Sequence, residues 1–209
     1  MTTCALVAAI DFNERHFSDC AQEGKFDAVY AVDAGFALLE QMGFVPDMAV
    51  GDFDSLGYIP RCRRVVELPV EKDKSDLEVA MDRAKKRNFD EVVIYGALGA
   101  RLDHTVANLQ MCARFAEEGM GVTFIAGDYA IRIVVGPDVF ELPTLERGTV
   151  SVFSATAESR GVIERGMHYS IDDQTLTNRT TWGLSNELEG REAAISIEEG
   201  TLYVFYPLG

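Results

Sequence analysis

The chain has 209 residues, of which 47% are hydrophobic, so it is long enough for one large domain or two small ones and can bury a core. Its formal net charge of −15 argues against nucleic acid as a partner, because a phosphate backbone requires a basic surface. The longest basic run, Lys85-Lys86-Arg87, is expected to be the solvated end of a helix, where positive charge is favourable.

The sequence carries no pattern for secretion or membrane insertion. Asp11 interrupts the first apolar stretch, no basic segment precedes it, and no apolar run reaches the length of a membrane span. The cysteines are scattered, at Cys4, Cys20, Cys62 and Cys112. Because they form no CxxC pair, we expect reduced thiols in a cytoplasmic protein that has no membrane partner.

Apolar runs of strand length alternate with segments of helical period up to Gly127. The predicted strands are Ala5–Ile10, Ala28–Val32, Met48–Val50, Val65–Leu68, Val92–Tyr95 and Val122–Ala126. The predicted helices are Phe36–Met42, Asp76–Asn88 and Thr105–Glu118. This alternation predicts an α/β domain over residues 1–127 with a mostly parallel sheet.

After Gly127 the helical periods end and short β-like stretches follow. These stretches are Ile131–Val135, Thr149–Phe153, Ala193–Ile197 and Leu202–Tyr206. Turn signals such as Gly136-Pro137 and Asp172-Asp173 separate them. Residues 128–209 are therefore predicted to form a second, all-β domain.

Charged residues recur just past the carboxyl ends of the predicted parallel strands. They are Asp33, the pair Asp52 and Asp54, the pair Asp73 and Asp76, and the pair Arg101 and Asp103. In open α/β sheets this edge binds ligands, so we expect the four segments to converge on one crevice.

Converging carboxylates require a counter-ion. Two of them about 4 Å apart repel by roughly 4 kcal/mol at an effective dielectric of about 20. A set of oxygen ligands without His or Cys is typical of Mg²⁺, which leaves its other positions to water and phosphate. Mg²⁺ is therefore the predicted cofactor.

Each cluster also has a purely structural interpretation. Ser75 and Glu78 fit a helix capping box, Asp103 can cap the helix that begins near Thr105, and Asp54 can close a turn. The glycine-rich stretch Gly96–Arg101 lacks the ending of a Walker loop, although a guanidinium beside a helix N-terminus favours phosphate. His104 adjoins Asp103 and can orient it or contact substrate.

Four blocks resemble, in order and spacing, the thiamine pyrophosphokinase family and especially its bacterial form. The blocks are DAGFALLEQMGFVPDMAVGDFDSL, EKDKSDLEVAM, YGALGARLDHTVANLQM and GLSNEL. The resemblance implies transfer of a pyrophosphoryl group from ATP to thiamine with Mg²⁺, giving thiamine diphosphate and AMP. It also implies a C-terminal β-sandwich and a homodimer whose thiamine site lies at the subunit interface.

The resemblance further assigns roles to matching residues. Those implied to hold the metal are Asp52, Asp54 and Asp76. Those implied around the nucleotide and its phosphates are Asp33, Asp73, Ser75, Arg101, Asp103, His104 and Asn108. Those implied at the thiamine pyrimidine are Ser185 and Asn186. The catalytic proton acceptor stays open between Asp52 and Asp103.

Two positions depart from the family pattern, because Ala34 and Ala100 stand where glycine is usual. A methyl group there puts nucleotide affinity in question if the backbone needs a positive φ. Trp182 has no matching position and is interpreted either as core packing or as a stacking partner for the thiamine ring.

Two other functions remain possible from the sequence. MAVGDFDSL is also compatible with a haloacid-dehalogenase-like phosphatase, although that motif normally follows the first strand and here follows two earlier ones. The other alternative is a catalytically inactive dimer that binds a nucleotide or a metal.

Overall fold

The computed structural model describes residues 1–209 and divides into two compact units. The first unit comprises Met1–Phe115 and Gly119–Gly127, and the second comprises Ala116–Glu118 and Asp128–Gly209. No helix in the chain is both long enough and apolar enough to span a lipid bilayer.

The first unit is built on six parallel strands in the order β6-β5-β1-β2-β3-β4. Their bounds are β1 Thr3–Ile10, β2 Ala28–Val32, β3 Met48–Gly51, β4 Val65–Glu67, β5 Glu91–Ala97 and β6 Gly121–Ile125. Every residue of β2 is buried, as expected for a strand covered on both faces. The prediction of a parallel α/β region is confirmed.

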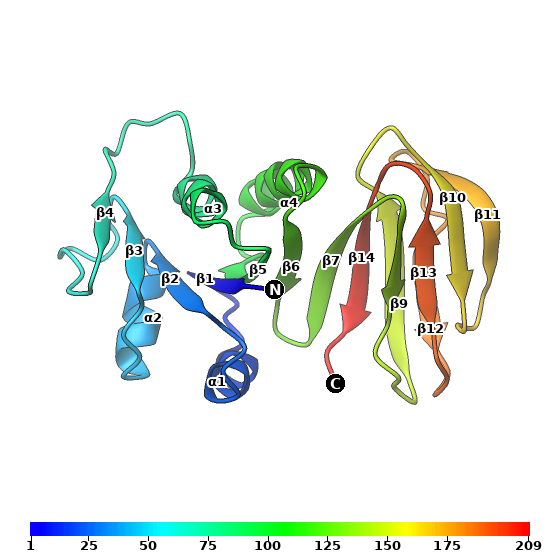
Figure 1. The fold of residues 1–209 in the computed structure, drawn as a ribbon, viewed down its shortest axis with the longest axis horizontal. Helices are drawn as coiled ribbons and strands as arrows, with labels where there is room; N and C mark the ends of the chain where they lie inside the picture. Colours follow the sequence, from blue (N-terminus) through cyan, green and yellow to red (C-terminus); the bar gives the residue numbers. More distant parts are fainter. The chain divides into compact units, whose positions relative to one another are not determined.

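Four helices flank these strands: α1 Glu14–Gln22, α2 Gly35–Gln41, α3 Asp76–Lys86 and α4 Leu102–Glu117. Figure 1 shows α1 and α2 on one face of the parallel strands, and α3 and α4 on the other. Helix α1 was not predicted from the sequence. Its residues are mostly polar and only Phe17 and Cys20 are buried along it, so it offers few apolar positions from which a helix could be recognised.

The ends of α3 illustrate why this segment is helical. The Ser75 hydroxyl accepts the Glu78 backbone N–H at 3.2 Å, which is the capping interaction that the sequence predicted. Acidic residues occupy the first turn and basic residues the last, in the sense that the helix dipole favours. The basic run is therefore the end of a helix, as expected, with Arg87 as the C-cap.

Chain connectivity creates a crevice in this unit. Strands β2, β3 and β4 follow one another on one side of β1, whereas β5 and β6 lie on its other side. The strand order thus reverses between β1 and β5, and ligands bind outside the carboxyl ends of strands at such a switch point.

The second unit contains two antiparallel sheets, ordered β12-β9-β14-β7 and β11-β10-β13-β8. Their bounds are β7 Tyr129–Val135, β8 Asp138–Glu141, β9 Gly148–Ser154, β10 Glu158–Arg165, β11 Ile171–Thr177, β12 Asn186–Leu188, β13 Ala194–Ile197 and β14 Thr201–Pro207. One hydrophobic cluster contains residues of both sheets, including Val152 of β9 and Ile195 of β13. The antiparallel character of this region is confirmed.

Four strands of the second unit, β8, β10, β11 and β12, escaped the sequence analysis. The β11 segment IDDQTLT buries only Ile171 and Leu176, and β12 has three residues. Short or polar strands of this kind give little hydrophobic pattern, because few of their residues are apolar. They form strands because neighbouring strands pair with them.

Candidate active site at the carboxyl ends of the parallel strands

Three acidic residues converge at the strand ends of the first unit. Asp33 follows β2, Asp52 follows β3 and Asp76 begins α3. One carboxylate oxygen from each lies within 4.8 Å of the others. The expected convergence of strand-end acids therefore occurs for these three side chains, which we call the acid cluster.

The backbone at Asp33 is shaped for this position. Asp33 has φ 46°, a left-handed conformation that a non-glycine residue adopts at an energetic cost. Gly51 lies so close that a Cβ atom there would stand 2.9 Å from the Asp33 Cα. The Ser55 hydroxyl donates to Asp33 Oδ2 at 2.8 Å, whereas Asp33 Oδ1 is buried without a hydrogen-bond partner.

Lys72 lies among these acids, although the sequence analysis did not single it out. Its Nζ lies 2.7 Å from Asp52 Oδ2 and 3.0 Å from Asp76 Oδ1, and its side chain is only 15% exposed. Lys72 lies in the loop before α3, where the four-residue spacing to Asp76 carries no helical meaning, so no local pattern in the sequence indicated this contact.

These contacts shift the pKa values of the three groups. The hydrogen bond from Lys72 lowers the pKa of Asp52. Burial raises the pKa of Asp76, and the contacts with Lys72 only partly oppose this effect. Burial disfavours the charge on Lys72, but its hydrogen bonds to both carboxylates outweigh burial and raise its pKa. Lys72 is therefore a charged ammonium group.

A cavity of about 500 Å³ lies beside the acid cluster. Its wall includes the ends of β1, β2 and β5, the segment from Val70 to Leu77, and two residues of α4, His104 and Asn108. Asn108 donates its side-chain N–H to the Ala97 carbonyl oxygen at 2.8 Å, which ties α4 to the end of β5. The cavity thus lies at the switch point of the sheet.

The glycine-to-alanine departures cause no backbone strain. Ala34 has φ −60° and ψ −13°, an ordinary helical conformation at the start of α2. Ala100 is also outside the positive-φ residues, whereas its neighbour Gly99 has φ 107°. In these two stretches a positive φ occurs at Gly99, where glycine adopts it freely, and at Asp33, where a non-glycine residue adopts it at an energetic cost.

The other predicted nucleotide residues are more exposed. Arg101 pairs with Asp103 at 2.5 Å on the surface, and this ion pair lowers the pKa of Asp103 to about 2. A carboxylate of that pKa is a weak proton acceptor. Asp73 and Ser75 line the cavity, and Ser75 also caps α3.

Asp54 is the predicted metal ligand that stands outside the acid cluster. Its side chain is exposed, and its backbone N–H points to Asp52 Oδ1 at 3.4 Å. Asp33 joins Asp52 and Asp76 in place of Asp54, because β2 and β3 are neighbouring parallel strands and the residues that follow them lie side by side. A role for Asp54 at the metal stays a prediction.

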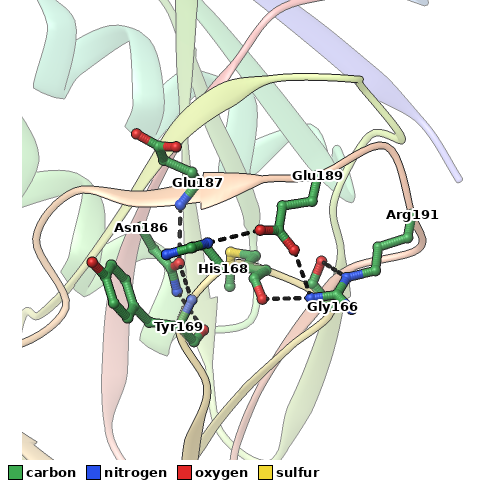
Figure 2. Close-up of polar contacts among 8 residues, drawn as sticks. Gly166, His168, Tyr169, Asn186, Glu187, Glu189 and Arg191 are labelled. Carbon is green, nitrogen blue, oxygen red and sulfur yellow. Dashed lines mark hydrogen bonds and ion pairs between the residues drawn. The ribbon is translucent and has the colours of Figure 1, made fainter.

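In the second unit, Asn186 is buried and its carboxamide is fully engaged within the protein. Figure 2 shows its contacts with Tyr169 and Glu187. Its Oδ1 accepts the backbone N–H groups of Tyr169 and Glu187 at 3.0 and 2.9 Å. Its Nδ2 donates to the Tyr169 carbonyl at 2.9 Å and to Glu164 Oε2 at 2.8 Å. Asn186 therefore has no hydrogen-bonding capacity left for a ligand in this conformation.

Figure 2 also shows a more exposed set of contacts beside Asn186. Glu189 accepts hydrogen bonds from His168 Nδ1 at 2.7 Å and from Arg191 at 2.8 Å. Arg191 also donates to the carbonyl oxygens of Gly166 and Met167 at 3.2 and 2.9 Å. These bonds connect the segment that follows β10 to the segment that follows β12.

Ser185, unlike Asn186, is available at the surface. It is exposed and has φ 61°, and its backbone N–H donates to Ser151 Oγ at 3.1 Å. Nearby in the chain, Trp182 is 59% exposed and Leu184 is 53% exposed. The interpretation of Trp182 as core packing is therefore wrong for this chain.

Comparison with known proteins adds a family. Residues 23–124 match the model described as thiamin pyrophosphokinase, catalytic domain. A protein named thiamine pyrophosphokinase from Bacillus subtilis (strain 168) is 27% identical over 178 residues, which cover 82% of this chain and 83% of that protein. The chain belongs to the thiamin pyrophosphokinase family.

Solved structures agree with this family in fold. The thiamine pyrophosphokinase of Bacillus subtilis superposes with a TM-score of 0.83 at 24% identity, covering 99% of both chains. A family protein from Enterococcus faecalis gives 0.81 at 21% identity and covers 100% of both. The Candida albicans enzyme gives 0.78 at 14% identity, covering 100% of this chain and 89% of its own.

Membership of the thiamin pyrophosphokinase family makes the chain an enzyme of the thiamine diphosphokinase class and confirms that prediction. The whole acid cluster and Lys72 lie within the matched residues 23–124. Ser185 and Asn186 lie outside them, so their assignment to thiamine stays a prediction.

Proposed function

We propose that this chain transfers the pyrophosphoryl group of ATP to the hydroxyethyl oxygen of thiamine, giving thiamine diphosphate and AMP. The observation that carries the proposal is the acid cluster beside a cavity of about 500 Å³, at the switch point of a sheet within the matched catalytic domain. The hydroxyl oxygen attacks the β-phosphorus, the bond from that phosphorus to the α-phosphate oxygen breaks, and AMP leaves.

The donor set of the acid cluster fits Mg²⁺. Asp33, Asp52 and Asp76 present only hard carboxylate oxygens, and Asp33 Oδ1 is buried without a partner. These three residues would hold the ion, with Asp54 as a fourth ligand. When bound, Mg²⁺ would supply positive charge that offsets the charge developing on the phosphate chain.

The remaining residues of this site bind and position the nucleotide. Asp73, Ser75, His104 and Asn108 belong to the segments that line or adjoin the cavity. Arg101 supplies a guanidinium group suited to phosphate oxygens once it exchanges Asp103 for them. The hydroxyl proton of thiamine passes to Asp52 or Asp103. The pKa values of both carboxyl groups are lowered, so they do not distinguish the two candidates.

We assign thiamine to the C-terminal β-sandwich, residues 128–209, of a homodimer with its thiamine site at the subunit interface. Ser185 is the exposed residue that contacts the pyrimidine, and the internal bonds of Asn186 position it. Exposed Tyr169, Trp182 and Leu184 near it offer apolar surface that a partner subunit and the thiamine ring would cover. Free cysteines agree with a cytoplasmic enzyme.

Product analysis tests the function directly. Purified protein with ATP, Mg²⁺ and thiamine should form AMP and thiamine diphosphate in equal amounts. Formation of ADP and thiamine monophosphate would refute pyrophosphoryl transfer. Release of inorganic phosphate would favour the phosphatase alternative, and binding without any product would favour the inactive dimer.

The shared site is tested by mixing two inactive chains. An Asp76→Asn chain and a Ser185→Ala/Asn186→Ala chain should regain activity together, because a mixed dimer has one site with every residue intact. With random exchange the recovered rate should approach about a quarter of wild type. If subunit exchange is confirmed by mass and the mixture stays inactive, each site is built within one chain.

A further inference from the structure

The ammonium group of Lys72 donates a hydrogen bond to Asp52 and forms an ion pair with Asp76, two of the three carboxylates that would hold the metal. Its Nζ lies 2.7 Å from Asp52 Oδ2 and 3.0 Å from Asp76 Oδ1, and only 15% of the side chain is exposed to solvent. Such a short, shielded contact is an ordered ion pair, in contrast to a surface lysine that exchanges freely with water.

The charges in this group are unequal. One lysine faces three carboxylates, so two negative charges remain uncompensated when no other cation is near. A divalent ion supplies that charge, and the acid cluster then becomes neutral with Lys72 still present. The lysine therefore does not remove the need for a metal, but it does repel one.

The geometry also sets Lys72 against the ion. Mg²⁺ demands octahedral ligands at about 2.0 to 2.1 Å. The ammonium group lies 2.7 Å from Asp52 Oδ2 and 3.0 Å from Asp76 Oδ1, so an ion bound to these two oxygens would lie directly against its positive charge. The lysine side chain also forms part of the cavity wall. An ammonium group that leaves Asp52 and Asp76 can therefore move toward a ligand in that cavity.

We propose that Lys72 is a built-in competitor of the metal, which weakens divalent-cation binding to the free enzyme and then transfers its ammonium group to nucleotide phosphates. This inference rests on the proposed function, since it takes the phosphates of ATP as the new partner of Lys72. The proposal implies that metal and nucleotide bind together. The metal displaces the ammonium group of Lys72, which then needs the phosphates as a partner, and the carboxylates that Lys72 leaves need the metal.

The competing explanation is that Lys72 only holds the acids in place. The two explanations differ in sign. If Lys72 competes, removing its charge tightens metal binding, whereas if Lys72 organises the ligands, removing it loosens the acid cluster and weakens metal binding.

The test measures Mn²⁺ binding to the purified enzyme without nucleotide or thiamine, by electron paramagnetic resonance of the free ion. Lys72→Met and Lys72→Gln should bind Mn²⁺ at least about tenfold more tightly than wild type. Lys72→Arg keeps the positive charge beside the acid cluster and should show no tighter binding than wild type. Equal or weaker binding by both neutral variants overturns the proposal.

Lys74→Met is the matched control. Lys74 lies two residues away, but its ammonium pairs with Asp82 at 2.7 Å and Glu78 at 3.5 Å, outside the acid cluster. Its loss should leave Mn²⁺ affinity within about threefold of wild type, because its charge is paired elsewhere. Equal tightening in Lys74→Met and Lys72→Met would reduce the effect to net charge and overturn the specific role of Lys72.

A second measurement needs no neutral variant and covers the case in which those variants fail to fold. In wild-type protein with ¹³C-labelled lysine, Mg²⁺ should shift the ε-methylene signal of Lys72 and leave that of Lys74 in place. An unmoved Lys72 signal at saturating Mg²⁺ overturns the proposal. Neither measurement depends on turnover, so a failed product assay would refute the proposed function without deciding the role of Lys72.

Discussion

Two polar clusters, one in each unit, satisfy their buried groups to different degrees. The acid cluster places three carboxylates beside one ammonium group and leaves one oxygen of Asp33 and one of Asp76 without a hydrogen-bond partner. Around Asn186, in contrast, every donor and acceptor of the carboxamide is bonded. The excess negative charge of the acid cluster indicates a ligand-binding site, whereas the hydrogen bonds of the Asn186 carboxamide are all made within the protein.

Glu164 is the exception in the cluster around Asn186. It is fully buried, its Oε2 accepts from Asn186, and its Oε1 has no partner. Burial raises the pKa of Glu164, which favours the neutral carboxyl group. Burial thus opposes the charge on Glu164, whereas the hydrogen bond from Lys72 lowers the pKa of Asp52 and favours its charge.

The largest expected effect separates the two clusters by activity. Asp76→Asn should lower kcat by at least about 100-fold, because it removes a ligand charge from the site of phosphoryl transfer. Steady-state rates at saturating ATP and thiamine measure this. Glu23→Gln, at the exposed end of α1, is the control and should keep the wild-type rate. A normal rate in Asp76→Asn would remove the acid cluster from catalysis.

Next, Asn186→Ala should lower the free energy of unfolding by about 3 kcal/mol, because it leaves several buried groups without partners. Arg191→Met in the exposed part of the same network should lower it by less than about 1 kcal/mol. Urea denaturation compares them. Equal losses would mean that Asn186 is no more structural than its exposed neighbours.

The pH dependence of Glu164 gives a smaller effect. Since its folded pKa lies above the unfolded value of 4.5, its stabilising contribution is complete below that pH and is lost as pH rises through the folded pKa. Gln does not titrate, so the stability of Glu164→Gln relative to wild type should grow above pH 4.5 by at most about 1.4 kcal/mol per pH unit. If the difference in unfolding free energy between Glu164→Gln and wild type does not change between pH 4.5 and 8, the pKa of Glu164 is not raised in the folded protein.

The smallest expected effect concerns the strained residue beside Asn186. Ser185 has φ 61°, so Ser185→Gly should be more stable than Ser185→Ala by about 1 kcal/mol. Both variants lose the hydroxyl group and should raise the KM for thiamine alike, leaving the KM for ATP unchanged. If the KM for thiamine rises only in the less stable Ser185→Ala variant and not in Ser185→Gly, the role of Ser185 is conformational and its hydroxyl group does not contact thiamine.

Local pattern was sufficient for much of the first unit. Apolar runs bounded by turn residues located all six parallel strands within a few residues, and the Ser75 cap located the start of α3. The strand-end position of Asp33, Asp52 and Asp76 followed from the same pattern, because parallel strands end at one edge. In the second unit, polar strands such as β11 gave no comparable signal.

The sequence by itself determined the parallel α/β architecture, the antiparallel character of the remainder, the family and the acids at the strand ends, since each is encoded in local periodicity or in ordered motifs. Tertiary structure alone decided that Asp33 and not Asp54 joins Asp52 and Asp76, that Lys72 lies between two of these acids, and that Asn186 is internal. These facts depend on which side chains meet across strands, helices and loops, and no spacing along one segment specifies such contacts.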